Sequence, residues 1–134
     1  MVVVVATTGV ASWSSLLSDY KTLAASPGVD ELQLMSTYAN PSNSKAMVES
    51  YFEKIKAGAG NLEKAGVGIG IYYDGRNGYA KDWTNSSARE FVENVVSLGG
   101  GGLDIFRLMK GKDDWPHDEF WWGIFEDFIS GQIV

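Results

Sequence analysis

Two short stretches of the chain carry residue types that could do chemistry. One is Tyr73–Gly78, YDGRNG, in which Asp74 offers a carboxylate and Arg76 can hold an anionic group. The other is Lys110–Trp122, KGKDDWPHDEFWW, which combines several acids with the only histidine of the chain and several of its five tryptophans. We take Asp74 and Asp114 as the candidate catalytic acids, but neither stretch identifies a reaction.

Each stretch also has a structural explanation. Asp-Gly and Asn-Gly are favoured turn dipeptides, so YDGRNG fits a plain turn as well as a site. In the second stretch, Asp114 can cap a helix and Pro116 suits its first turn. Its acids and His117 could hold a hard metal such as Mg²⁺, but a single histidine without a second acid cluster favours helix initiation. We therefore predict no metal site.

The composition limits the classes of function. At 134 residues, 45% hydrophobic and 21% charged, the chain is predicted to form a single domain over residues 1–134. A net charge of −6 with scattered basic residues argues against nucleic-acid binding. The absence of cysteine excludes disulfides, thiolate nucleophiles and Cys-based zinc sites.

Targeting and cofactor motifs are also missing. No stretch approaches the roughly 20 apolar residues that span a membrane, and the opening MVVVV lacks the basic flank of a signal peptide. We therefore expect an intracellular, cytoplasmic protein that does not bind membranes. Asn85-Ser86-Ser87 matches a glycosylation sequon, but without a secretory signal we interpret it as the start of a helix. The Gly-rich segment Lys56–Asn61 lacks the Gly-Lys-Ser/Thr of a phosphate loop, so no cofactor is predicted.

Strand and helix patterns alternate along the chain. Four apolar runs flanked by Gly or polar residues are predicted strands: Val2–Thr7, Glu31–Tyr38, Gly66–Tyr73 and Leu103–Met109. Apolar residues recur at helical spacing between and after them, in the groups Leu16/Leu17/Tyr20/Leu23, Met47/Tyr51/Phe52/Ile55, Phe91/Val92/Val95/Val96 and Phe120/Trp121/Ile124/Phe125/Phe128/Ile129. The strands start roughly 30 residues apart, the length of one βα unit, which predicts parallel strands joined by right-handed crossovers.

This pattern predicts a (βα)4 half of a TIM barrel with helices outside, or alternatively a small open flavodoxin-like parallel sheet. Strand alternation favours the half-barrel. In the second strand Leu32 and Leu34 oppose Gln33, and in the third Val67 opposes Gly68. An aliphatic outer face with a small or polar inner face is typical of a barrel strand, whereas a sheet between two helix layers is aliphatic on both faces.

Three segments resemble a known family. Leu32–Pro41 (LQLMSTYANP) is similar to the sixth barrel strand of family 18 glycoside hydrolases of the plant-chitinase type, Gly66–Ile71 (GVGIGI) to the seventh, and Gly101–Phe106 (GGLDIF) to the closing strand. The resemblance covers roughly residues 31–115 and implies the C-terminal half of a barrel. The family's catalytic motif, Asp-x-x-Asp-x-Asp-x-Glu, does not occur, and Phe106 stands where the family has Trp, so no glycosidase mechanism is implied.

In parallel α/β folds, ligands bind beyond the carboxyl ends of the strands. Three of the four loops there carry a tryptophan shortly before a helix. Such tryptophans can stack on a sugar or another flat polar ligand, or each can pack onto the first turn of its helix. The candidate ligand-binding residues are Tyr38, Asn40, Asp74, Arg76, Trp83, Asp113, Asp114, Trp115 and His117.

Asp104 and Arg107 lie on opposite faces of the fourth predicted strand, so one of the two charges points toward a buried side and needs a partner. Asp104 comes early in the strand, deep below the rim where barrel enzymes act. We therefore favour a structural ion pair over a catalytic role for it.

Two functions remain open. The chain is either a half-barrel module that binds a carbohydrate or small polar ligand, hydrolase-like if it is catalytic at all, or a non-catalytic structural or interaction domain. A half-barrel monomer would expose two edge strands and one apolar concave face. We therefore expect a homodimer or a completed barrel, with association at micromolar concentration.

Overall fold

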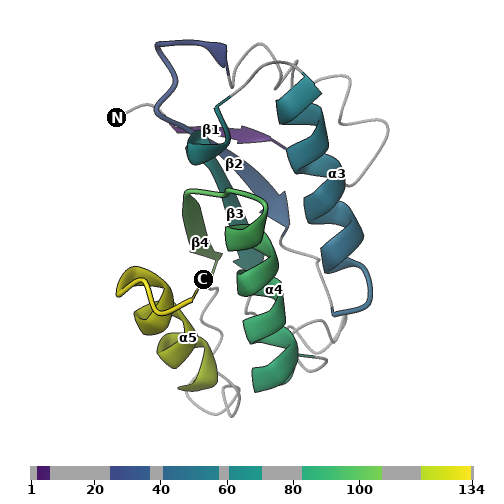
Figure 1. Ribbon diagram of the computed structural model, residues 1–134, viewed down its shortest axis with the longest axis vertical. Helices are drawn as coiled ribbons and strands as arrows, with labels where there is room; N and C mark the ends of the chain where they lie inside the picture. Colours follow the sequence, from purple (N-terminus) through teal and green to yellow (C-terminus); the bar gives the residue numbers. More distant parts are fainter. Residues whose placement is uncertain are drawn as a thin grey trace.

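The chain folds into alternating strands and helices, described from a computed structural model for residues 3–6, 25–36, 41–57, 61–70, 83–106 and 119–133 (Figure 1). The strands are β1 (Val3–Ala6), β2 (Glu31–Ser36), β3 (Ala65–Gly70) and β4 (Gly102–Phe106). The helices are α3 (Ser44–Ala57), α4 (Asn85–Ser97) and α5 (Glu119–Ile129), with a short 3-10 turn, η1 (Leu62–Lys64), before β3. The helix expected around Leu16–Leu23 lies outside the described residues.

The sheet is parallel, and its strands lie in the order β1-β2-β3-β4, which is also their order in the sequence. The predicted α/β class with a parallel sheet is therefore confirmed. The order differs from that of the flavodoxin-like alternative, in which the second strand lies outside the first. The described part of β3 and of β4 each begins one residue earlier than predicted, at Ala65 and Gly102.

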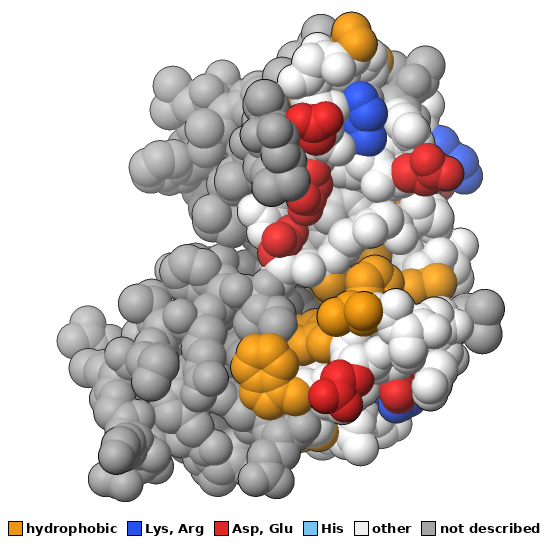
Figure 2. All heavy atoms as spheres, turned by 90° about the vertical axis from the view of Figure 1, so that its left-hand side faces the viewer, with side chains coloured by type: hydrophobic (Ala, Val, Ile, Leu, Met, Phe, Trp, Pro, Cys, Tyr) orange, Lys and Arg blue, Asp and Glu red, His pale blue; other side chains and the backbone are white. Residues whose placement is uncertain are grey.

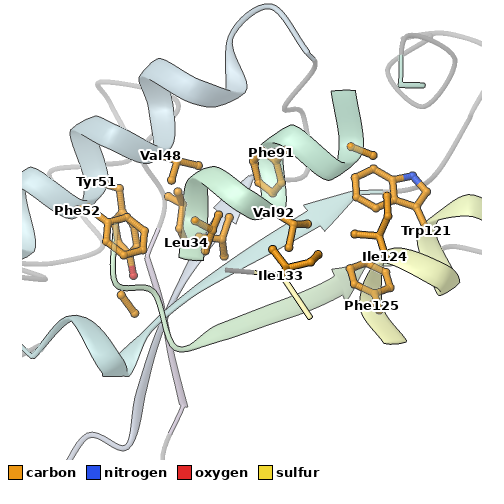
Figure 3. Packing of buried hydrophobic residues seen from close by; sticks show 14 of the residues in the cluster. Leu34, Val48, Tyr51, Phe52, Phe91, Val92, Trp121, Ile124, Phe125 and Ile133 are labelled. Carbon is orange, nitrogen blue, oxygen red and sulfur yellow. The ribbon is translucent and has the colours of Figure 1, made fainter. Parts of the chain in front are cut away.

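The described helices pack on one face of the sheet, and the core lies between the two layers (Figures 1 and 3). Side chains alternate between the two faces along a strand, and the buried residues of β2 and β3 all point to the face covered by the helices. They are Leu32, Leu34, Ala65 and Val67. The helices contribute Val48, Tyr51, Phe52, Ile55, Ala88, Phe91, Val92, Val95, Trp121, Ile124 and Phe125. The predicted helical stripes are thus largely the core-facing ones.

The end of the last stripe departs from the prediction. Trp121, Ile124 and Phe125 are buried as expected, but Ile129 is 83% exposed. Ile129 is the last residue of α5, where the helix has passed the edge of the core. None of the described helices has the length and apolar character needed to cross a lipid bilayer.

Capping interactions define both ends of α4, and its start agrees with the helix start expected at Asn85-Ser86-Ser87. The Thr84 side chain accepts a hydrogen bond from the Ser87 backbone N–H at 3.1 Å, and the Ser87 hydroxyl accepts one from the Thr84 backbone N–H at 2.9 Å. This reciprocal capping box explains Asn85-Ser86-Ser87 as the start of a helix. At the other end Gly99 has φ 88°, a left-handed conformation that terminates the helix and that glycine adopts without strain.

One buried hydrogen bond ties the helix layer to the sheet. The hydroxyl of Tyr51 on α3 donates to the carbonyl oxygen of Leu32 on β2 at 2.6 Å. The Tyr51 ring also meets Phe52 edge-on, with centroids 5.5 Å apart. The hydroxyl therefore fixes how α3 sits on the strand that carries Glu31.

Tyr51→Phe is expected to lower the free energy of unfolding by about 1–2 kcal/mol, because it keeps the ring and removes the donor to a buried carbonyl. Urea denaturation measures this loss. Glu53→Gln, on the exposed side of the same helix, is the control and should change stability by less than about 0.5 kcal/mol. Equal stabilities of Tyr51→Phe and the wild-type protein would contradict the role given to the hydroxyl.

Candidate functional site

Of the candidate site residues, only Trp83 falls within the described part of the chain. The others lie outside it, so their convergence at the strand ends stays a prediction; they are Tyr38, Asn40, Asp74, Arg76, Asp113, Asp114, Trp115 and His117.

Trp83 lies in the core, immediately before the N-cap of α4, and is only 3% exposed. Its ring meets Phe91 of α4 and Trp121 of α5 edge-on, with centroid distances of 5.5 and 5.4 Å. Its indole Nε1 is buried and has no hydrogen-bond partner in the part of the chain that the structure describes. The ring thus has no exposed face on which a ligand could stack, and the packing interpretation describes Trp83 in this structure.

A different group of functional side chains lies on the sheet face opposite the helices. Strand alternation turns Glu31 and Gln33 of β2 and Asp104 of β4 to this face. Between them β3 presents only glycine: a Cβ placed on Gly66 would lie 2.5 Å from Glu31 Oε1 and 3.2 Å from Asp104 Oδ2. The two carboxylates therefore meet above Gly66, in the space that a side chain of β3 would otherwise fill.

We call Glu31 and Asp104 the acid pair. Both side chains are half-buried. Burial raises the pKa of Glu31 above its ordinary value of 4.5, and the neighbouring Asp104 raises it further through a shared hydrogen bond and through its charge. Oδ2 of Asp104 is buried and has no hydrogen-bond partner among the described residues.

The ion pair predicted for Asp104 is not found within the described residues, where its neighbour is another acid. The nearby Lys64 donates instead to the carbonyl oxygens of Ser26 and Val29, at 3.1 and 2.7 Å. Arg107, the other charge of the prediction, lies outside the described part of the chain. The acid pair is thus a half-buried site of negative charge without a described cation.

Glu31 was predicted only as the start of a strand and not as a site residue. Its position in the strand could have indicated more, because side chains alternate and Glu31 therefore shares a face with Gln33, opposite Leu32. The glycines of the next strand were the second signal, because Gly66 leaves room for a long side chain from β2.

The position of the acid pair limits what it can do. A carboxyl group with a raised pKa, such as that of Glu31, suits acid–base catalysis. The pair, however, lies toward the amino ends of β2 and β3, whereas barrel enzymes act at the carboxyl ends. In the ranges that the structure describes, no group of three or more acids or histidines could hold a metal. The pair is therefore suited to binding a proton or a positively charged group.

Apart from the acid pair, a concavity of about 340 Å³ lies between α3 and α4 on the helix layer. Phe91 contributes to its wall, and Lys45, Glu90 and Glu93 bring charges of both signs. All three of these charged side chains are exposed, whereas Glu31 and Asp104 are half-buried, so the acid pair is the stronger candidate site.

The fold defines a two-layer α/β protein with a parallel sheet in sequence order and its described helices on one face. A scan of protein-family models, a search of curated proteins and a search of solved structures each find no match to this chain. The resemblance to family 18 glycoside hydrolases rests on the three segments quoted above.

Glu31→Gln is expected to raise the free energy of unfolding near neutral pH by a few tenths to about 1 kcal/mol, the range for cross-strand charge pairs. Because the folded state raises the pKa of Glu31, it binds this proton more tightly than the unfolded chain does. Ionising Glu31 therefore costs the folded state free energy. This cost is absent below pH 4.5 and complete above the raised pKa, so the free energy of unfolding of the wild-type protein falls as pH rises through that window.

Urea denaturation at a series of pH values measures this effect. The Glu31→Gln variant should lack the part of the pH slope that Glu31 contributes, whereas the exposed control Glu63→Gln should keep it. Identical slopes for the wild-type protein and Glu31→Gln would show that the acid pair carries no such penalty.

Proposed function

We propose that the chain is a (βα)4 half-barrel that acts as an interaction domain, completing a barrel with a second βα half. The observation that carries the proposal is an exposed apolar flank on α5, beside the sheet edge at β4. The second half can be another copy of this chain or a different polypeptide.

Sheet order and layering support the half-barrel. In a TIM barrel, consecutive strands are neighbours and every helix lies outside the sheet. The order β1-β2-β3-β4, with the described helices on one face, follows the same rule. The described face away from the helices carries glycines and polar side chains. Small and polar residues are also common on the inward-facing side of barrel strands.

The flank of α5 is formed by Trp122 and Ile129, which are 46% and 83% exposed. They are seven residues apart and so lie within about 20° of each other around the helix. Asp127 forms an ion pair with Arg89 of α4, which identifies the side of α5 that faces α4. Trp122 and Ile129 are roughly 150° around the helix from Asp127 and thus face away from α4.

This flank lies where the next helix of a barrel would pack. In the described part of the chain β4 pairs only with β3, so its other edge is open on the same side. Figure 2, viewed from the left-hand side of Figure 1, shows apolar side chains gathered in the lower part of the described surface, with acidic side chains both above and below them. An open edge and an apolar helix flank together form a surface suited to another βα unit.

The expectation of a homodimer took the concave face to be apolar. The side chains described on that face are Glu31, Gln33 and Asp104 above glycines. The described apolar surface available for association is instead the flank of α5. Homo-oligomerisation remains a proposal with this different basis.

Wild-type protein is expected to self-associate at micromolar concentration in about 1 M NaCl, where screening within about 3 Å removes the repulsion between chains of net charge −6. Trp122→Ser and Ile129→Ser should each weaken association roughly tenfold, because each removes about 1–2 kcal/mol of apolar burial. Sedimentation equilibrium measures the dissociation constants.

The control for this experiment is Glu53→Ser, an exposed change on α3 away from β4, which should leave association unaltered. All three variants should unfold at wild-type urea concentrations, because the replaced side chains are exposed. A protein that remains monomeric at tens of micromolar in high salt would refute the half-barrel function.

A second proposal is that the strand ends bind a carbohydrate or small polar ligand. Its support is the family 18-like segments together with the polar face, where Glu31 and Gln33 lead along β2 toward Tyr38 and Asn40. If the module is catalytic, Asp74 and Asp114 are its candidate acids, and the reaction is hydrolase-like. The absence of the family's catalytic motif favours binding without catalysis.

Titration with a chito-oligosaccharide should change the tryptophan fluorescence of the wild-type protein, and Trp115→Ala should abolish the response because it removes the stacking surface. Trp122→Ala, which removes an exposed tryptophan from α5, is the control and should keep the response. No response from wild-type protein, or an undiminished response from Trp115→Ala, would contradict this binding site.

A further inference from the structure

The acid pair on the open sheet face is incomplete as a set of charges. Glu31 and Asp104 meet above Gly66, both are half-buried, and Oδ2 of Asp104 is buried without a hydrogen-bond donor. A carboxylate withdrawn from water is stable only when a donor or an opposite charge replaces the lost hydration. The pair therefore calls for a cationic or donor group, and the residues that the structure describes place none beside it.

The strands around the pair do not supply this group. β1 (VVVA) and β3 (AGVGIG) contain no titratable residue, and the only titratable residue of β4 is Asp104 itself. The Gln33 amide lies over Gly68 instead, with Nε2 3.1 Å from where a Cβ of Gly68 would be. Among the described cations near the sheet, Lys64 is held by the carbonyls of Ser26 and Val29. A cation for the pair must therefore come from outside these four strands.

The geometry of the face indicates how that cation would arrive. Gly66 and Gly102 leave bare backbone beneath Glu31, since a Cβ on Gly102 would lie 3.4 Å from Glu31 Oε1. No side chain of β3 stands between the two carboxylates. In a closed barrel, the layers inside the sheet are filled by side chains from alternate strands around the whole barrel. A side chain from the opposite half would therefore reach the acid pair from above the face.

We propose that this face is a docking surface for a βα half that brings an arginine or lysine side chain to Glu31 and Asp104. The inference rests on the half-barrel function and names the chemistry of the partner. An unaltered second copy presents its own Glu31 and Asp104, so it would gather four carboxylates in one interior. Like charges facing each other across an interface oppose association, and a cationic half is selected by the complementary charge.

A charge-reversed copy of the chain provides the probe. The double variant Glu31→Lys with Asp104→Arg carries a basic version of the same face on the same scaffold. Mixed with wild-type protein at low ionic strength, it should form a 1:1 complex at least about tenfold tighter than either protein forms with itself, and the gain should shrink in about 1 M NaCl. Native mass spectrometry of isotope-labelled wild-type protein distinguishes the mixed complex from the self-associated ones.

The matched control is Glu53→Lys with Glu93→Arg, which makes the same change in net charge on exposed positions of α3 and α4. Its mixture with wild-type protein measures the attraction due to net charge alone. A gain no larger than that of this control would overturn the proposal, because it would show that charge at the sheet face has no particular effect.

A second variant keeps the test valid if the charge-reversed chain does not fold. Glu31→Gln with Asp104→Asn removes the charges while keeping the shapes, and it should self-associate more tightly than wild-type protein does at the same low ionic strength. No improvement over wild-type protein at low salt would again overturn the proposal.

The two proposals fail in different ways. Absence of wild-type self-association in high salt counts against the half-barrel function itself. Self-association in high salt, without a gain from the charge-reversed or neutral variants, leaves the half-barrel function in place and rejects only the cationic partner.

Discussion

The structure depends on the alternation of side chains along β2 and β3. Leu32, Leu34 and Val67 are buried under the helices, and this burial determines the parity of both strands. A shift of one residue would expose this aliphatic set and bury its polar neighbours, so the register is strongly specified. The same parity turns Glu31 and Asp104 to the other face. The acid pair is thus a direct consequence of how the core is made.

In the proposed half-barrel, the unsatisfied surfaces of the described residues lie on the side that would close the barrel. The acid pair would occupy the barrel interior, and Trp122 and Ile129 form the flank where the next helix would pack. In an isolated half-barrel, the acid pair has no described cationic partner, and the flank of α5 exposes apolar surface to water. The proposed second βα half would supply a cation to the acid pair and would bury the apolar flank of α5. This coincidence is the physical reason to regard the domain as one that works in association.

Sequence patterns predicted most of the described helices and strands, and they failed where a residue's role depends on distant neighbours. Burial at helical spacing anticipated Phe91 and Trp121, and capping chemistry anticipated the start of α4 at Asn85. Trp83 fitted both stacking and packing, and only its contacts with two aromatic rings distinguish them. Ile129 was assigned to the core because its spacing is correct, although α5 has already left the core at that point.

The sequence by itself determined the βα alternation and the aliphatic and polar faces of the strands, because spacing, turn glycines and caps act over a few residues. Only the tertiary structure decided that Glu31 meets Asp104. That meeting depends on the registers of two strand pairs, with Gln33 beside Gly66 and Gly66 beside Gly102. It also needs a glycine in the middle strand to leave space above the backbone. Long-range pairing of this kind leaves no periodic signal in the chain, so it appears only when the strands are assembled.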